Sequence, residues 1–408
     1  MAKKQIVKQG NRRADLDHKP SSKPPLKKAA GRQTSSSKSA SAPAKDEAAV
    51  KDVRDPAVVR EQQQALDVFK SAFNEQTLSS PDFTATLQRV KQALFERDFA
   101  RAFGSDEYLA VYAARWSPTR ALCYASILKD IEEHLYTIYI RQDPSTTSTD
   151  PEPVTQSPQE TAQVEQRQNH PRKRQEVLRT LCIGGGAAEL VAFGSFLQNQ
   201  DHVKGEVALL DSADWSSVVN SLQSALTTTA PLSQSAQLLP SPFIPPERLS
   251  TRFIEQDVLT MATDKLSDAI SPSPSFTPTA NPSHPRPVLV TLLFTLNELF
   301  TAAGIGKTTA FLLNLTSVTP PGSLLLVVDS PGSYSETIVG SSSKKYPMQW
   351  LMDRVLLNTQ KEPVEGRKWT KLESHDSIWF RLPETGLQYP IQLENMRYQL
   401  HLYRADSA

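Results

Sequence analysis

Cysteine, long apolar runs and net charge are all scarce in this sequence, and each scarcity excludes a class of protein. Cys123 and Cys182 are the two cysteines among 408 residues, too few for a disulfide scaffold and without the spacing of a metal site. No segment approaches the roughly 18 apolar residues of a membrane-spanning helix, and the amino-terminal segment lacks the apolar core of a signal peptide. We therefore expect a soluble protein of a reducing, intracellular compartment, with no metal and no membrane contact.

The formal net charge is only +1, but positive charge is concentrated near the amino terminus. Residues 1–45 carry a local charge of about +10, and residues 1–52 consist largely of Lys, Ser, Pro and Ala. Such a segment cannot bury enough apolar surface to fold, so we predict a disordered basic tail over 1–52. The tail is suited to a nuclear or nucleolar address and to attraction by RNA phosphates, and a solubilising role fits it equally well.

Apolar residues recur at helical spacing between residues 56 and 140, which predicts a helical amino-terminal region. Within it, Ser117-Pro118 predicts the end of one helix and the start of the next, because proline suits a first helical turn. The following segment, 141–175, is polar and rich in Pro, Ser and Thr. We predict that it is a linker to a second domain.

Cations and aromatic rings are combined around this proline, at Tyr112, Arg115, Trp116 and Arg120. The combination suits stacking on bases and pairing with phosphates. Aromatic residues at helical spacing are more often packed in a core, and composition alone favours that interpretation.

Strands and helices alternate between residues 176 and 405, which predicts an α/β domain with a mainly parallel sheet and helices on both faces. The expected strands are 178–183, 205–211, 253–258, 288–294 and 323–328, followed by an antiparallel pair at 377–382 and 391–402. The expected helices are 187–199, 215–226, 308–315 and 346–356. Two Pro/Ser/Thr-rich segments, 227–249 and 267–287, are predicted to be inserted surface loops.

The first strand of this domain runs into Gly184-Gly185-Gly186, and a helix-forming segment follows at once. Glycines in such a turn permit positive φ and let a ligand approach the backbone, while the helix start presents free N–H groups. The turn therefore predicts a nucleotide or cofactor site.

Two of the three ligands considered for this turn fit poorly. A nicotinamide site needs a glycine where Glu189 stands, so the close helix–strand packing of that motif is missing. A phosphate-binding loop is suggested at 304–309, but Thr301 occupies the position of its first glycine and no strand is predicted before it.

S-adenosylmethionine is the third candidate. Its sites need a glycine turn after the first strand, an acid after the second for the ribose hydroxyls and a polar residue after the third for adenine; here these are Gly184 to Gly186, Asp211 and Asp257. Either acid could also be a loop or cap residue. Their shared place at the carboxyl ends of successive strands favours a cofactor site.

Several segments together resemble the fungal 25S ribosomal RNA uridine-N3 methyltransferases, a small S-adenosylmethionine-dependent family. The resemblance covers roughly residues 90–403 and is carried by the segments 181–190, 115–120, 296–299, 307–309 and 329–334. It implies a class I Rossmann-like methyltransferase fold and methylation of a uridine N3 in large-subunit rRNA. The sequence departs from most class I enzymes at Cys182, where an acid usually stands.

The resemblance also implies roles for individual residues. Cofactor contacts are expected from Gly184, Gly185, Gly186, Glu189, Asp211 and Asp257. The catalytic candidates are Asn297, Glu298, Asp329 and Ser330, with Glu298 or Asp329 as acceptor of the N3 proton, although a helix-start acid and a turn former are equally good interpretations of these two. RNA contacts are expected from Arg115, Trp116, Arg120, Lys307, Lys344 and Lys345, and Arg115-Trp116 could instead form a lid over the cofactor.

We expect ribosomal RNA or a pre-ribosomal particle as partner, a monomeric state, and a nuclear or nucleolar location with the cytoplasm as the alternative. A competing hypothesis is an inactive methyltransferase-like adaptor that binds RNA during ribosome assembly. The residue at Cys182 favours the adaptor, whereas the glycine turn, Asp211 and Asp257 favour the enzyme.

Overall fold

The computed structural model describes residues 55–139, 176–229, 241–271, 286–332, 334–339, 342–357 and 367–407. These segments belong to one compact unit. The tail predicted over 1–52 and the linker predicted over 141–175 lie outside the described residues, as do residues 230–240 and 272–285 of the two predicted inserts.

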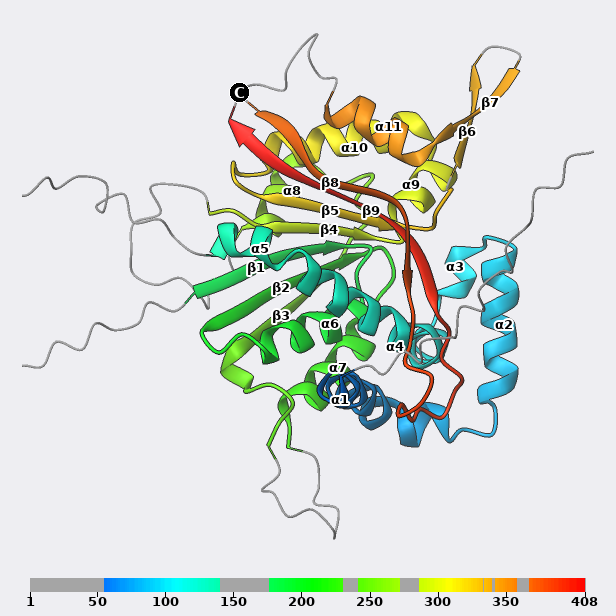
Figure 1. The fold of residues 1–408 in the computed structure, drawn as a ribbon. Coiled ribbons are helices and arrows are strands. Elements are labelled where there is room, and N and C mark those ends of the chain that lie inside the picture. Colours follow the sequence, from blue (N-terminus) through cyan, green and yellow to red (C-terminus); the bar gives the residue numbers. More distant parts are fainter. Residues whose placement is uncertain are drawn as a thin grey trace, which may run out of the picture. The chain divides into compact units, whose positions relative to one another are not determined.

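A single seven-stranded sheet forms the centre of this unit (Figure 1). Its strands are β1 Glu176–Ile183, β2 Val203–Asp211, β3 Leu249–Glu255, β4 Leu289–Leu293, β5 Leu324–Asp329, β8 Arg367–Phe380 and β9 Met396–Ser407. They lie in the order β3-β2-β1-β4-β5-β9-β8. The first five are parallel to one another, and β9 is antiparallel to both β5 and β8. This arrangement confirms the predicted class I methyltransferase sheet with its antiparallel last pair.

One face of the sheet is covered by helices from both the amino-terminal region and the second half of the chain. They are α1 Pro56–Phe73, α4 Asp106–Asp130, α5 Glu132–Tyr139, α6 Ala187–Gln198 and α7 Ser216–Thr227. Their apolar side chains share one buried cluster with strand residues such as Leu178 and Leu326. The π-helix Asn74–Leu78 leads to α2 Phe83–Phe95 and α3 Phe99–Ala102, which lie beside α4. The amino-terminal helices are therefore part of the same core as the sheet.

The other face carries four helices: α8 Thr263–Ile270, α9 Leu296–Ala302, α10 Ile305–Val318 and α11 Met348–Leu356. They pack on strand side chains that include Leu181, Val290 and Val327. Every residue of β4 and β5 is buried, because helices cover both faces of these central strands. None of the described helices is long and apolar enough to cross a membrane.

The break predicted at Pro118 is wrong, because α4 continues through it from Asp106 to Asp130. A proline inside a helix has no N–H to donate to the carbonyl four residues earlier, here that of Ala114. In this structure the hydroxyl of Tyr389 donates to that carbonyl at 2.8 Å. A side chain from the loop between β8 and β9 thus replaces the missing hydrogen bond and lets the helix continue.

Other element boundaries also differ from those predicted. β3 begins at Leu249, inside the first predicted insert, and α8 continues to Ile270, inside the second. Leu266 and Ile270 are buried on one side of α8, so this short helix belongs to the core although its surroundings are rich in Pro and Ser.

Three strands of the carboxyl-terminal half were placed incorrectly or missed. The hairpin of β6 Tyr334–Val339 and β7 Ser342–Pro347 was not predicted, and β8 begins at Arg367, well before residue 377. β8 is the edge strand of the sheet, and only Trp369 and Phe380 are buried along it. An edge strand with so few buried side chains lacks the apolar alternation by which strands are recognised.

Candidate active site

A cavity of about 770 Å³ lies at the carboxyl ends of β1, β2 and β4, beneath the amino-terminal helices. Its walls include residues of α2, α3 and α4, the glycine turn after β1, the loops after β2 and β3, and the start of α9. Nine of the predicted site residues line it: Arg115, Trp116, Arg120, Gly184, Gly186, Glu189, Asp211, Asp257 and Glu298. Residues predicted from separate segments for cofactor, RNA and catalysis thus meet in one space.

The glycine turn is closely packed against its neighbours. Gly184 has φ +68°, and a Cβ atom there would lie 2.3 Å from Oγ1 of Thr295. A Cβ on Gly186 would lie 3.1 Å from the ring of Trp215, and one on Gly185 would lie 2.5 Å from Cβ of Cys182. No larger residue fits at Gly184 or Gly185, and Gly186 allows the backbone to reach the cavity beside the indole.

Cys182 lies beneath this turn and does not line the cavity. Its side chain is fully buried, and burial raises the pKa of the thiol well above its usual value. An uncharged residue suits this place because the turn covers it. The sulfur therefore performs a packing role at the position where most class I enzymes carry an acid.

Glu189, one turn into α6, brings a carboxylate to the cavity wall. Its Oε2 accepts the backbone N–H of Gly186 at 2.9 Å, which caps the first turn of the helix. Glu189 is 6% exposed, and burial raises its pKa although this hydrogen bond opposes the shift. The cap holds the glycine turn against the helix that follows it.

Asp211 ends β2 and Asp257 comes just after β3, as predicted, and both line the cavity. Oδ1 of Asp211 accepts the N–H of Ala213 at 2.8 Å, and burial raises the pKa of Asp211 to about 6. Asp257 is exposed, and its Oδ1 accepts the N–H of Leu259 at 2.9 Å. Both carboxylates also shape their own loops, and Asp211 is the more deeply held of the two.

Three residues of α4 cover the cavity. The guanidinium of Arg120 donates to the hydroxyl of Tyr112 at 2.5 Å and lies 5.4 Å from the ring centroid of Phe294. Arg115 forms an ion pair of 2.5 Å with Glu394, from the loop between β8 and β9. The ring of Trp116 lies 4.9 Å from that of Tyr112. The cations and rings predicted to contact RNA or to form a lid therefore face the cavity that the glycine turn opens into.

Phe294 was not recognised from the sequence as a site residue. It follows β4 directly and has φ +58°, a left-handed conformation that is rare outside glycine, and its N–H donates to the carbonyl of Val328 at 2.7 Å. Its ring lies between Arg120 and Tyr124, 6.4 Å from the latter. Such strained positions cluster at functional sites. No sequence pattern marks an unusual φ at phenylalanine, so the structure alone identifies it.

Trp215, Thr295 and Glu394 also line the cavity and were not predicted to do so. Glu394 lies more than 200 residues from the glycine turn, in a loop whose place the strand pattern did not reveal. For Trp215 a signal existed, because it follows the acid at the end of β2 closely.

The predicted catalytic residues separate into two groups. Glu298 on α9 lines the cavity, and burial raises its pKa. Asp329 is 3% exposed, and its two oxygens accept the N–H groups of Asn297 at 3.0 Å and Ser330 at 2.8 Å. Burial raises the pKa of Asp329 to about 6. Asp329, Asn297 and Ser330 are not among the cavity-lining residues, and Asp329 holds the start of α9, from which Glu298 projects.

The lysines predicted to bind RNA belong to α10 and β7, and neither element contributes a described residue to the cavity wall. Lys307 is exposed on the first turn of α10, and Lys344 and Lys345 belong to β7. The segment before Lys307 is helix α9, so the strand required for a phosphate-binding loop is replaced by a helix. This confirms the rejection of that motif.

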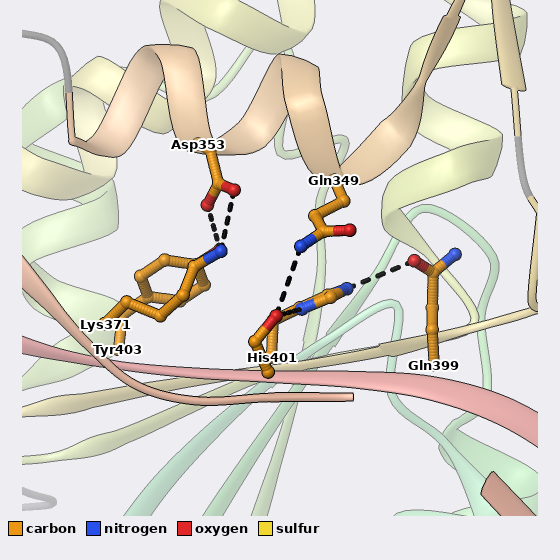
Figure 2. Close-up of polar contacts among 7 residues, drawn as sticks. Gln349, Asp353, Lys371, Gln399, His401 and Tyr403 are labelled. Atoms are coloured by element: carbon orange, nitrogen blue, oxygen red, sulfur yellow. Dashed lines mark hydrogen bonds and ion pairs between the residues drawn. The ribbon is translucent and has the colours of Figure 1, made fainter. Parts of the chain in front are cut away.

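A chain of polar groups leads from the loop after β5 through β9 to β8, and Figure 2 shows its part between Gln399 and His401. Gln399 donates its amide to the carbonyl of Ser330 at 2.7 Å, so its oxygen faces His401, 3.1 Å from Nε2. His401 must therefore donate from Nε2, and its Nδ1 accepts from the hydroxyl of Ser374 at 2.9 Å. Burial and the nearby Lys371 lower the pKa of His401 to about 4, so the ring stays neutral.

Beside this chain, Asp353 of α11 accepts from Nζ of Lys371 and from the hydroxyl of Tyr403, both at 2.6 Å (Figure 2). The amide of Gln349, also on α11, donates to the hydroxyl of Ser374 at 3.1 Å, so both clusters fasten α11 to β8 and β9. Among the described residues there is no group of His, Cys, Asp and Glu that could hold a metal ion.

Comparison with known proteins agrees with this geometry. Residues 69–404 match the family model Methyltransf_34, which describes SAM-dependent methyltransferases. The chain is 30% identical over 370 residues to the 25S rRNA (uridine(2843)-N(3))-methyltransferase of Saccharomyces cerevisiae, and the match covers 84% of this chain and 85% of the yeast protein.

Two solved structures are more distantly similar. One is a S-adenosylmethionine-dependent methyltransferase from Clostridium acetobutylicum, with TM-score 0.27 and 9% identity over 56% of this chain and 84% of that one. The other is a mutant of the 16S rRNA (adenine(1408)-N(1))-methyltransferase from Catenulisporales acidiphilia, with TM-score 0.28 and 13% identity over 57% and 88%.

Proposed function

Because the chain belongs to the family of S-adenosylmethionine-dependent methyltransferases, we propose that it transfers a methyl group to N3 of a uridine in large-subunit ribosomal RNA. The observation that carries the proposal is the single cavity that joins the glycine turn, Asp211 at the end of β2, and Glu298. The yeast relative, which covers most of both chains, supports the same substrate.

The residues of the cavity fit the cofactor. Gly184 and Gly186 of the turn line the cavity, and its volume of about 770 Å³ is within the range of small-molecule sites. Asp211 presents a carboxylate that can accept from ribose hydroxyls, and Asp257 lies where adenine is expected. When bound, S-adenosylmethionine supplies an activated methyl group on a sulfonium centre.

Arg120 supplies the cation that this site needs for the carboxylate of the methionine part. One hydrogen bond, to Tyr112, uses only part of the five-donor guanidinium, and the remainder faces the cavity beside the glycine turn. Arginine keeps its charge even when buried. We therefore assign Arg120 to the cofactor rather than to RNA, and with Glu189 it takes over the polar role that Cys182 cannot perform.

Glu298 is the group that we assign to the proton of uridine N3. Its carboxylate lines the cavity, and its pKa is raised by burial, as suits a base that must take up a proton. Asp329 uses both oxygens for backbone N–H groups, and so its role is to position α9. Because N3 lies on the Watson–Crick edge, the uridine must leave its base pair to reach Glu298.

Contacts of Lys307, Lys344 and Lys345 with RNA remain part of the proposal, together with the basic tail as an unspecific anchor. A substrate made in the nucleolus, and a tail with a local charge of about +10, support a nuclear or nucleolar location. We propose a monomer acting on rRNA or a pre-ribosomal particle.

The proposal is tested by mapping N3-methyluridine in large-subunit rRNA transcribed in vitro after incubation with the protein and S-adenosylmethionine. Glu298→Gln is expected to lower the rate of methyl transfer by about 100-fold or more and to leave cofactor affinity unchanged. Asp329→Asn serves as the comparison, because loss of positioning should lower thermal stability as well as the rate. A wild-type protein that binds the cofactor but modifies no uridine would contradict the proposal, and one that binds no cofactor would favour the inactive adaptor.

A further inference from the structure

One tryptophan on the surface carries two arginine side chains and no acidic partner. Trp379, on β8, is 51% exposed, and the guanidinium carbons of Arg381 and Arg397 lie 5.0 and 5.6 Å from its ring centroid. Nε of Arg397 also donates to the hydroxyl of Ser377 at 2.7 Å, which fixes the orientation of that guanidinium. Within the described part of the chain, neither arginine forms an ion pair. We call Trp379, Arg381 and Arg397 the Trp379 patch.

The register of the sheet places this patch at the substrate edge. Asp329, the last residue of β5, pairs with Gln399, and Arg397 lies two residues further along β9 on the same face. Arg397 and its partner Trp379 therefore extend beyond the carboxyl end of β5, the edge at which the cavity opens. Glu394, three residues before Arg397, is itself part of the cavity wall.

The composition of the patch favours nucleic acid over protein. An exposed indole offers a flat surface on which any base can stack, and two guanidinium groups without carboxylate partners suit the phosphates on either side of that base. Asp376 and Glu384 are exposed in the same hairpin, but neither neutralises the two arginines. A large apolar side chain such as Trp379 on an exposed edge strand promotes unwanted association between chains unless it has a binding partner.

The other exposed aromatic residues lack this combination. Trp350 of α11 has Arg354 at 5.5 Å, but its ring is already stacked on Tyr346 at 4.9 Å. Tyr136 of α5 is 56% exposed and lies against the ring of Tyr139, and Phe95 of α2 is 86% exposed; among the described residues neither ring has a cation above it. Of these four aromatic residues, Trp379 alone has cations beside a ring that no other ring covers.

We propose that the Trp379 patch binds an unpaired stretch of the substrate RNA beside the target uridine, with one base stacked on Trp379 and the adjoining phosphates held by Arg381 and Arg397. This inference rests on the proposed function. Because the uridine must leave its helix to enter the cavity, its neighbours lose stacking partners, and a base on Trp379 recovers that contact at the edge where the strand enters.

The test uses the full-length protein and a fluorescein-labelled, single-stranded RNA, as long as one strand of about one helical turn. The RNA contains the uridine that the mapping experiment identifies, and binding is followed by fluorescence anisotropy. Trp379→Ala is expected to raise the Kd about tenfold, and Trp379→Phe to recover most of the affinity. Arg381→Ala and Arg397→Ala should each lower the slope of log Kd against log salt by about 0.7. Tyr136→Ala is the matched control, because it removes an exposed ring without a cation and should change neither quantity.

Methylation separates failure of this inference from failure of the proposed function. Wild-type protein that neither binds nor methylates the RNA overturns the proposed function. Wild-type protein that methylates the RNA, with Trp379→Ala within twofold of it in affinity and rate, overturns the patch alone. If Trp379→Ala slows methylation of large-subunit particles but not of protein-free rRNA, the patch binds a ribosomal protein and the inference is wrong. Unchanged cofactor affinity in Trp379→Ala shows that the cavity is intact.

Discussion

The carboxyl ends of the parallel strands and the antiparallel part of the sheet hold their carboxylates in different ways. At the ends of the parallel strands, Asp329 is buried and Asp211 is half-buried. Both accept from backbone N–H groups, and their pKa values are raised to about 6. In the antiparallel part, Asp353 is matched by Lys371 and Tyr403, and His401 is kept neutral within a chain of hydrogen bonds.

The two regions therefore have different roles: the ends of the parallel strands form the binding site, and the antiparallel strands support it. Asp211 brings a carboxylate without an ion-pair partner among the described residues to the cavity wall, which suits a ligand that carries a sulfonium. The paired groups under α11 hold the frame from which the loop after β5 and the Trp379 patch extend. We expect substitutions in the parallel part to change ligand binding and substitutions in the antiparallel part to change stability.

The largest effect is expected in the parallel part, at Gly184. Gly184→Ala must adopt φ +68° and place Cβ against Thr295, so the turn has to move, and we expect the Kd for S-adenosylmethionine to rise about 100-fold or more. Isothermal titration calorimetry measures it. Gly306→Ala is the control, since a Cβ there meets nothing within 4 Å. Equal affinities for the two variants would show that the turn does not contact the ligand.

The next effect belongs to the antiparallel part and depends on pH. The pKa of His401 is lowered to about 4 in the folded chain, whereas an unfolded histidine titrates near 6.5. The stability that the neutral ring gives the folded protein is therefore fully present above pH 6.5 and is lost as the pH falls toward 4. Between pH 7.5 and 5.0 the loss is about 2 kcal/mol in the free energy of unfolding.

Urea denaturation of the wild type and of His401→Gln at both pH values isolates this loss. Asp211 and Asp329 contribute in the opposite direction, because their raised pKa values make stability fall as the pH rises through 6, but both are present in each protein. The same pH dependence in wild type and variant would mean that His401 titrates normally.

A smaller effect is expected where the antiparallel loop supports α4. Tyr389→Phe removes the donor to the carbonyl of Ala114 and should lower the free energy of unfolding by about 1–2 kcal/mol. In a Pro118→Ala background the helix supplies its own N–H, so the same change should cost less than about 0.5 kcal/mol. A double-mutant cycle measures the coupling, and additive effects would argue against it.

The smallest effect returns to the cavity. If the ionised form of Asp211 accepts the ribose hydroxyls, its pKa of about 6 predicts that the Kd for S-adenosylmethionine rises about fourfold between pH 7.5 and 5.5. The carboxylate is then largely protonated and accepts less strongly. Titrations across this range measure the change, and Asp211→Asn should flatten it. An unchanged Kd in the wild type would remove Asp211 from the ribose site.

Much of the fold could be predicted from the sequence because the parallel strands are buried on both faces. Continuous apolar runs such as Leu289–Leu293, each followed by a turn and a helix, predict a strand whatever lies beside them. β8 carries charged and polar residues on both sides and gave no such signal. Pro118 predicted a helix break because the residue that replaces its missing hydrogen bond, Tyr389, lies 275 residues from Ala114.

The site could be predicted from the sequence only in part, because some of its residues are placed by contacts that are distant in the sequence. Gly184, Asp211 and Asp257 follow their strands directly, so position along the sequence also gives position in space. The direction of a side chain is not given in this way. Arg120 turns toward the cavity because α4 lies over the glycine turn, and Asp329 turns toward α9 because the N–H of Asn297 is there to be bound.

The contacts of α4 with the loop between β8 and β9 can form only late in the synthesis of the chain. The carbonyl of Ala114 and the guanidinium of Arg115 leave the ribosome long before Tyr389 and Glu394, which follow 275 and 279 residues later. At about 5–20 residues per second this delay is roughly 14 to 55 s. During this time α4 lacks its contacts with Tyr389 and Glu394. The pocket for the methyl donor is therefore complete only when translation is nearly finished.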